Sequence, residues 1–239
     1  ISAVNRYNIT IKNGIVRGFY FGIYLDNDDN HQGAGHRIEG IQASNNGSCG
    51  IYARYSTVTN CTANNNAGRG IYAPYSTVTN CTANNNGDDG IYASRSTVTN
   101  CTAYNNGDDG ICAYYSTVTN CTAYNNGGDD GIYAYCSTVT NCTANNNGYH
   151  GIFAYYSTVT NCTAYNNGDD GITAYYSSTV TNCTANNNGS DGIYAYNSTV
   201  KGCNVRENTG YGISMGTNYH NYIYRNAAGW NTAGQINCP

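Results

Sequence analysis

A segment of about 20 residues recurs seven times in the middle of this 239-residue chain. Its most regular part, Ser-Thr-Val-Thr-Asn-Cys-Thr-Ala, first begins at Ser56 and last at Ser178, and the cysteine within it returns every 20 or 21 residues. A period this short and strict is typical of a solenoid, in which each unit buries its apolar side only by stacking on its neighbours. The repeat therefore predicts a single elongated domain.

One repeat, Gly70 to Gly90, contains three short stretches in which inward and outward residues alternate, as in β-strands. Asn80 separates the second stretch from the third, and Asn tolerates the left-handed backbone of a one-residue corner. The residues expected to point inward are Ile71, Val78, Cys81 and Ala83, and those expected to point outward are Tyr72, Thr77, Thr79 and Thr82. Three strands and three corners per unit predict an all-β fold, a three-sided parallel β-helix with about 9–10 turns, or rungs, of 20–21 residues.

The sequence resembles the right-handed parallel β-helix repeat proteins of the pectin-lyase-like superfamily from about Ile9 to Ile223. The resemblance rests on the Gly-Ile-Tyr-Ala strand, the Ser-Thr-Val-Thr-Asn-Cys-Thr-Ala stretch and the Asn-Asn-Gly-Asp-Asp-Gly corner. It implies a right-handed coil, with irregular rungs over 1–50, regular repeats over 51–212, and a last rung and tail over 213–239. Because that superfamily mixes lyases, hydrolases, epimerases, adhesins and structural proteins, the resemblance implies a fold rather than an activity.

Composition narrows the environment of the protein. Only 10% of the residues are charged and the net charge is -4, which excludes the basic surface that nucleic-acid binding requires. No run of about 18 apolar residues is present, so no membrane-spanning helix is expected. Low charge with 29 Gly and 26 Tyr predicts an extracellular or cell-surface protein.

Stacked rungs lie about 4.8 Å apart, so equivalent residues form columns along the axis. One asparagine column is followed each time by Cys-Thr and so matches the glycosylation sequon, but we expect it to form a hydrogen-bonded asparagine ladder inside the corner. Its members are Asn60, Asn80, Asn100, Asn120, Asn141, Asn161 and Asn182. The sequons outside this column are the predicted glycan sites, namely Asn8, Asn46, Asn188 and Asn197.

The repeated cysteines form an inward column of eight, expected to be mostly reduced thiols, with vertical disulfides as the alternative. Cys49 and Cys238 lie off this column, about eight rungs apart, and would form a disulfide only between molecules stacked end to end.

An acidic column follows the turns: Asp89, Asp109, Asp130, Asp170 and Asp191, interrupted by His150 and preceded by Arg69. We expect a solvated turn whose aspartates bond to their own backbone, with calcium absent or weakly held. The alternative is calcium between Asp88, Asp89, Asp108 and Asp109, because carboxylates and carbonyls suit that ion. No other cofactor is expected.

Tyrosines form outward columns whose density exceeds what a monomer needs, which indicates a contact surface for a glycan or for another copy of the chain. The predicted binding residues are Tyr52, Tyr72, Tyr92, Tyr114, Tyr135, Tyr155, Tyr175 and Tyr196.

Three functions remain open. The preferred one is a non-enzymatic structural protein that self-assembles into a filament or sheath through its ends and its Tyr-rich faces. The second is ice binding through two outward ranks of threonine, which resemble the Thr-x-Thr arrays of insect antifreeze β-helices. These ranks are Thr57/Thr59, Thr77/Thr79, Thr97/Thr99, Thr117/Thr119, Thr138/Thr140, Thr158/Thr160 and Thr179/Thr181.

The third function is polysaccharide binding or degradation, in the latter case by a polysaccharide lyase or glycoside hydrolase. The Asp-Asp pairs recur almost unchanged through several rungs, whereas a catalytic centre is normally a local departure from its scaffold. We therefore favour a protein without enzyme activity. The irregular stretch from Asp26 to His36, with Asp28, Asp29 and His31, is the best place for an active site if one exists.

Overall fold

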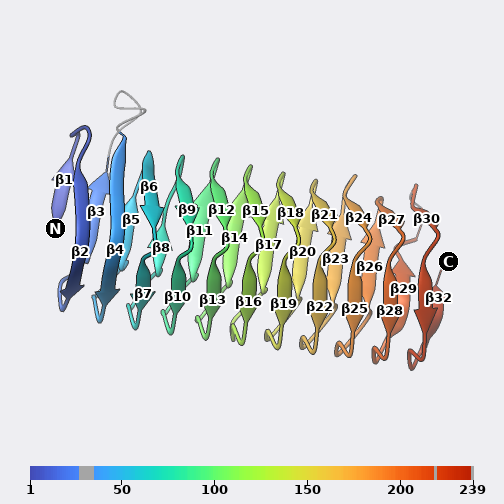
Figure 1. Cartoon of the computed structure of the whole chain (residues 1–239). Coiled ribbons are helices and arrows are strands. Elements are labelled where there is room, and N and C mark those ends of the chain that lie inside the picture. The colour runs from blue at the N-terminus through green and yellow to red at the C-terminus, as the bar shows by residue number, and fades with distance from the viewer. Residues whose placement is uncertain (27–34, 218–219, 238–239) are drawn as a thin grey trace.

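The computed structural model describes residues 1–26, 35–217 and 220–237, which form a straight parallel β-helix with the two chain ends at opposite ends of the coil (Figure 1). The described residues form only strands and turns. Within those same residues, no helix long and apolar enough to cross a membrane exists.

One side of the coil is a twelve-stranded sheet with one strand from each successive rung. Its strands are β1 (Ser2–Val4), β3 (Ile23–Asp26), β5 (Ile51–Ala53), β8 (Ile71–Tyr72), β11 (Ile91–Ser94), β14 (Ile111–Tyr114), β17 (Ile132–Tyr135), β20 (Ile152–Tyr155), β23 (Ile172–Tyr175), β26 (Ile193–Tyr196), β29 (Tyr211–Met215) and β32 (Gly234–Asn237). Twelve stacked strands correspond to about 11 turns, more than the 9–10 expected, because the terminal rungs keep the fold without keeping the repeat.

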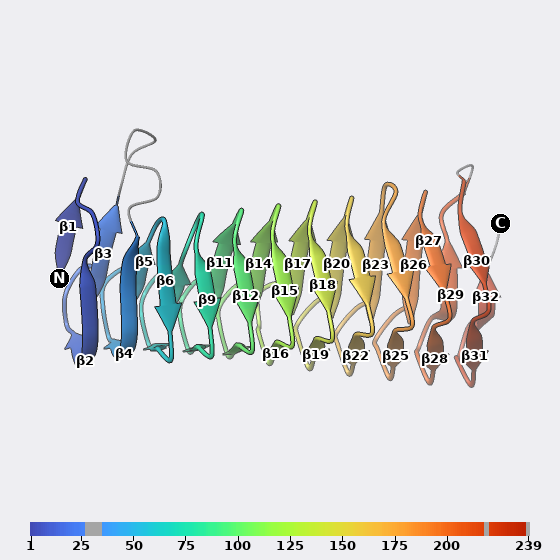
Figure 2. The ribbon, with the colours of Figure 1, turned by 45° about the horizontal axis from the view of Figure 1, so that its top comes forward.

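The other two sides belong to one twenty-stranded sheet, since the long strands β2 (Thr10–Arg17) and β4 (His36–Ser44) span both sides. The second side continues as β6 (Ser56–Thr59), β9 (Thr77–Thr79), β12 (Thr97–Thr99), β15 (Thr117–Thr119), β18 (Thr138–Thr140), β21 (Thr158–Thr160), β24 (Thr179–Thr181), β27 (Thr199–Lys201) and β30 (Tyr222–Tyr224). The third side continues as β7 (Thr62–Asn64), β10 (Thr82–Asn84), β13 (Thr102–Tyr104), β16 (Thr122–Tyr124), β19 (Thr143–Asn145), β22 (Thr163–Tyr165), β25 (Thr184–Asn186), β28 (Asn204–Arg206) and β31 (Ala227–Gly229). Figure 2 shows the three strand columns running along the coil.

The predicted faces are confirmed. Ile71, Val78 and Ala83 are fully buried and Cys81 is 1% exposed, while Tyr72, Thr79 and Thr82 are half-buried and Thr77 is exposed. The strands pair in register, so each inward column is continuous, for example Val78 on Val98. The two extra residues near Gly127 and Ser177 lie in turns and leave the strand register intact, because an insertion at a corner does not change which face a strand residue occupies.

Each regular rung turns through three single residues in the left-handed region, for example Tyr75 (φ 54°), Asn80 (φ 53°) and Asn85 (φ 54°). The residue after each one points inward and accepts the backbone N–H of its equivalent in the preceding rung. Examples are Ser76 N to Ser96 Oγ at 2.9 Å, Cys81 N to Cys101 Sγ at 3.4 Å, and Asn86 N to Asn106 Oδ1 at 3.2 Å. These ladders satisfy the donors that the kinks remove from the sheets.

The asparagine ladder exists, but its predicted position is wrong. Asn80 and its equivalents are exposed corner residues, whereas the buried ladder is the column six residues further along, which includes Asn86 and Asn106. Side-chain amides there link successive rungs at 2.9–3.0 Å. The left-handed backbone at Asn80, which was predicted, turns its side chain outward and leaves the inward place to Cys81.

Candidate functional site

An acidic column runs along the corner that precedes the twelve-stranded sheet. Asp89, Asp109, Asp130 and Asp170 expose only 3%, 6%, 3% and 8% of their surface, so the solvated turn expected from the sequence is wrong for these residues. The carboxylates of Asp109, Asp130 and Asp170 accept backbone N–H groups of the next rung, as from Asp130 to Asp109 at 3.0 Å and from Asp191 to Asp170 at 2.8 Å. The column is therefore a fourth internal ladder, built from acceptors.

Burial raises the pKa of every one of these carboxyls. The pKa rises to about 6 for Asp89, to about 8 for Asp109 and to about 9 for Asp130, with repulsion from neighbouring aspartates adding to the effect of burial. The middle of the column is consequently protonated near pH 7 when no cation is bound.

Arg69 neutralises one end of the column. Its Nε lies 2.8 Å from Asp89 Oδ2 and 3.8 Å from Asp88 Oδ2, and its guanidinium carbon lies 4.5 Å from the ring centroid of Tyr92. This pair explains why the pKa of Asp89 rises less than that of Asp109, with which no lysine or arginine of the described residues forms an ion pair.

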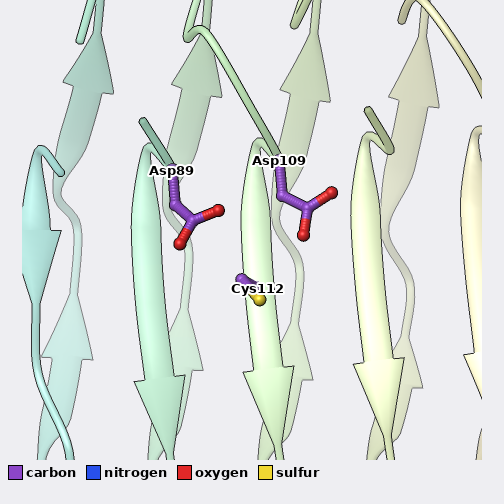
Figure 3. Close-up of side chains that lie close together, drawn as sticks. All are labelled: Asp89, Asp109 and Cys112. Atoms are coloured by element: carbon purple, nitrogen blue, oxygen red, sulfur yellow. The ribbon is translucent and has the colours of Figure 1, made fainter. Parts of the chain in front are cut away.

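Cys112 marks the first of two departures beside the acidic column. It takes the place of Tyr92 and Tyr133 in the strand register, and its small side chain lies beneath Asp109 (Figure 3). Its Sγ and a carboxylate oxygen from each of Asp89 and Asp109 lie within 4.8 Å of one another. Burial raises the pKa of the Cys112 thiol, which keeps it protonated.

The predicted calcium ligands fall into two overlapping groups. Carboxylate oxygens of Asp88, Asp89 and Asp108 lie within 4.8 Å of one another, and so do those of Asp108, Asp109 and Asp129. Calcium takes six to eight oxygen ligands, and each of these groups offers carboxylate oxygens from three residues only. The expectation that calcium is absent or weakly held at this corner stays a prediction.

The second departure from the repeat is a pair of residues, His150 and Thr173 of the next rung, which lie in contact. His150 Nδ1 lies 3.9 Å from Asp169 Oδ2, 3.9 Å from Asp170 Oδ2 and 3.3 Å from Thr173 Oγ1, and Thr173 donates to Asp170 Oδ2 at 2.9 Å. Burial lowers the pKa of His150 and so favours a neutral ring. Sequence reasoning recorded His150 only as an interruption of the aspartates, although the replacement of Asp-Asp by Tyr149-His150 was the signal.

The predicted tyrosines lie together on the outer face of the twelve-stranded sheet, in two columns that we call the Tyr face. The columns are Tyr52, Tyr72, Tyr92, Tyr133, Phe153 and Tyr194, and Tyr114, Tyr135, Tyr155, Tyr175 and Tyr196. Successive rings stack on each other, with centroids 4.5 Å apart for Tyr52 and Tyr72 and 5.4 Å for Tyr135 and Tyr155. The rings are half-buried.

Two tyrosines at the neighbouring corner stand out from the Tyr face. Tyr115 is 55% exposed and Tyr156 is 49% exposed, and both lie nearly at right angles to Tyr135, at interplanar angles of 73° and 89°. Cys136 lies between them in the corner column, so the two rings flank a gap one rung wide. The Arg95 guanidinium lies over the Tyr115 ring, 5.8 Å from its centroid, and the Tyr156 ring packs against Tyr176 at 5.8 Å, so each tyrosine leaves about half of its surface exposed for a ligand.

The threonine ranks lie on the second side of the coil in unbroken register, as in Thr77 on Thr97 and Thr79 on Thr99. The outer member of each pair is exposed or half-buried. The predicted array is thus formed as expected, and its role stays a prediction.

Two predicted glycan sites are wrong. Asn46 and Asn188 are 2% and 1% exposed and belong to the buried asparagine ladder, where each amide is hydrogen-bonded to its neighbours. Asn8 is exposed and Asn197 is half-buried, so both remain candidates. The exposed corner column at Asn60 and its equivalents, which was assigned to the ladder, now presents seven sequons to solvent.

The cysteines of the described chain are free thiols, and the repeated column is buried as predicted. Cys49 is buried as well, while its proposed partner Cys238 lies outside the described residues. Asp28, Asp29 and His31 of the irregular stretch also lie outside them. Of the same stretch, Asp26 accepts a hydrogen bond from the Tyr24 hydroxyl at 2.9 Å, and His36 is buried.

Comparison with known proteins supports the architecture. Residues 1–137 and 116–234 match the family described as right handed beta helix region. No curated protein matches the chain.

Among solved structures, the chain is similar to the A-module of mannuronan C-5 epimerase AlgE6 from Azotobacter vinelandii, with a TM-score of 0.63 and 14% identity over 97% of this chain and 89% of that one. It is also similar to pectate lyase Pel9A, with a TM-score of 0.57 and 16% identity over 98% of this chain and 66% of that one. The Dettilon tailspike protein gives a TM-score of 0.60 at 12% identity, over 98% and 61% of the respective chains. At these identities the likeness shows the fold alone.

Proposed function

This chain belongs to the right-handed β-helix family, and we propose that it is an extracellular protein that binds a polysaccharide along its Tyr face. The observation that carries the proposal is the pair of exposed tyrosines, Tyr115 and Tyr156, beside the half-buried tyrosine columns of the Tyr face. Aromatic faces pack against the apolar side of sugar rings, and phenol hydroxyls exchange hydrogen bonds with sugar hydroxyls. The similar epimerase and lyase, whose names refer to mannuronan and pectate, support a polysaccharide ligand.

Charge selects the kind of polysaccharide. The corner beside the Tyr face carries the accessible carboxylates of Asp88, Asp108 and Asp169 in addition to the buried column, and Arg69 is already paired with Asp89. A polyuronate would be repelled there unless cations bridged the two acidic surfaces. We therefore propose a neutral polysaccharide and binding without catalysis.

The test is affinity electrophoresis of the whole chain in gels that contain a neutral β-glucan or a polyuronate. The double variant Tyr115→Asn/Tyr156→Asn should bind the neutral polymer about tenfold more weakly, because two stacking platforms are lost while Asn keeps the left-handed backbone. Tyr165→Asn, on the third side of the coil, is the matched control and should bind normally. Equal retardation of both variants, or retardation by polyuronate alone without added calcium, would refute the proposal.

Ice binding is the second candidate, favoured by the regular register of the Thr-x-Thr pairs over seven rungs. Thermal hysteresis of the purified protein would support it. A Thr79→Tyr variant that leaves the hysteresis unchanged would exclude this face. Self-assembly into a filament or sheath also stays a prediction, which electron microscopy of the protein would test.

A further inference from the structure

The repeated sequence is altered in two successive rungs, at positions that lie next to each other in space. In one rung Tyr149-His150 replaces the Asp-Asp pair of the acidic corner, and in the next rung Thr173 replaces the aromatic residue that Phe153 represents in the strand register. The two changes are 23 residues apart in sequence, yet they meet in space, with Thr173 Oγ1 3.3 Å from His150 Nδ1. A bulky ring at position 173 would fill the space that the imidazole and the carboxylates now share.

We infer that His150, Asp169 and Asp170 form a binding site for a divalent transition-metal ion of the zinc type. Their donor atoms, His150 Nδ1 and one oxygen of each carboxylate, all lie within 4.8 Å of one another, and the two distances from Nδ1 are 3.9 Å. Ligands of a tetrahedral zinc ion at about 2.0–2.2 Å lie about 3.3–3.6 Å apart, so small side-chain rotations close the site.

Thr173 supports this arrangement from outside the ligand set. Its hydroxyl donates to Asp170 Oδ2 at 2.9 Å and so fixes which carboxylate oxygen faces the imidazole. Residues that orient ligands in this way are characteristic of metal sites. The ring of Phe153, with its centroid 5.7 Å from that of His150, holds the imidazole plane from the other side.

The donor set selects the metal. One imidazole nitrogen with two carboxylate oxygens suits zinc and its neighbours in the first transition series, whereas calcium prefers six to eight oxygens. At the other end of the column Arg69 already supplies positive charge to Asp89, whereas Asp169 and Asp170 form no ion pair with a lysine or arginine of the described residues. Asp169 is half-exposed and Tyr149 is 47% exposed, so the fourth coordination position opens to solvent.

The test is isothermal titration of the reduced full chain with ZnCl2, together with visible absorption spectra on addition of CoCl2. We expect one ion per chain at this site, and an affinity at least tenfold lower in His150→Asp, which restores the residue found at this corner in neighbouring rungs and should therefore fold. Thr173→Val should weaken binding by about 10–100-fold, as is usual when a residue that orients a metal ligand is lost. Asp108→Asn, at the equivalent of Asp169 three rungs away, and Cys136→Ser are the matched controls and should leave the affinity unchanged.

Zinc binding of equal affinity and stoichiometry in the wild type and His150→Asp would overturn the inference. So would the absence of any zinc binding below about 1 mM, an affinity too weak for a formed site. If His150→Asp does not fold by circular dichroism, Asp169→Asn, which changes a half-exposed residue, replaces it in the same comparison.

Discussion

Two polar columns run side by side along this coil, three or four residues apart in each turn, and they behave in opposite ways. In the asparagine ladder, Asn126 donates to Asn147 Oδ1 at 2.9 Å and to Ala103 O at 3.4 Å, and it accepts two N–H groups from Asn106. Every amide both donates and accepts, so the ladder is neutral and saturated. In the acidic column, Asp130 accepts from the backbone of the next rung but has no complementary donor to offer when ionised.

The difference shows what a buried repeat demands of its side chains. A buried amide can recur in every rung without an energetic penalty, because the same group supplies both the donor and the acceptor of each hydrogen bond. A buried carboxylate can recur in this way only if it is protonated or neutralised by a cation. The raised pKa values of Asp109 and Asp130 express that demand. The asparagine ladder is therefore structural, and the acidic column is where stability couples to pH and to bound cations.

The largest expected loss of stability comes from placing a carboxylate, as in the acidic column, at a position of the asparagine ladder. Asn126→Asp removes two donors and adds a buried charge at a fully buried position, which should lower the free energy of unfolding by about 3 kcal/mol or more at pH 8. Part of this loss should return at pH 4, where the new carboxyl is protonated. Urea unfolding at the two pH values measures both effects. The exposed neighbour Asn125→Asp is the control, and a similar loss in both variants would contradict a saturated ladder.

The reverse change should stabilise the protein. Because the pKa of Asp109 is raised to about 8, the stability linked to it is present below the unfolded pKa, about 4, and is lost as the pH rises through about 8. The wild type should therefore melt at a lower temperature at pH 9 than at pH 5. Asp109→Asn keeps the acceptor for Asp130 N–H and should raise the stability by up to about 5 kcal/mol at pH 9 but by only about 1 kcal/mol at pH 5. A melting temperature that does not depend on pH would show that the column is not protonated.

The repeat made the fold, the inward faces and the corner at Asn80 predictable, because identical units must stack in register. It did not identify the ladder, since Asn80, Asn85 and Asn86 recur equally and the sequence does not say which amide points inward. The terminal rungs distinguish the two asparagine columns. The corner column continues as Gly40 and Gly202, both with positive φ, whereas the ladder column stays asparagine at its ends.

The candidate site was harder to predict than the fold. The Asp-Gly pairs have the composition of a solvated turn, and their burial follows only from the closeness of successive rungs. His150 and Thr173 become neighbours only because successive rungs stack in register, which places Thr173 on Phe153 and so beside the corner of His150.

A smaller effect should follow from removing the cation at the end of the column. Arg69→Met leaves the buried Asp89 without its ion pair, which raises the pKa of Asp89 above about 6. Since Arg69 is partly exposed, the expected loss is about 1 kcal/mol at pH 8 and close to zero at pH 4. Thermal melts at both pH values measure it, and Arg95→Met, which changes an arginine outside the column, is the control. An equal loss at the two pH values would mean that Arg69 acts through packing on Tyr92 instead.

The smallest effect concerns asparagine in its other role, at the exposed corner. Asn100 has φ 53° and its side chain faces solvent, so Asn100→Gly should change the free energy of unfolding by no more than about 0.5 kcal/mol. Asn100→Ala should cost about 1 kcal/mol, because alanine tolerates the left-handed region less well. Asn106→Gly in the buried ladder should cost several times more, since it removes the side-chain hydrogen bonds from Asn86 Nδ2 and to Asn126 Oδ1 at a buried position. Urea midpoints of the three variants rank them, and a costly Asn100→Gly would show that the corner amide, too, carries a structural bond.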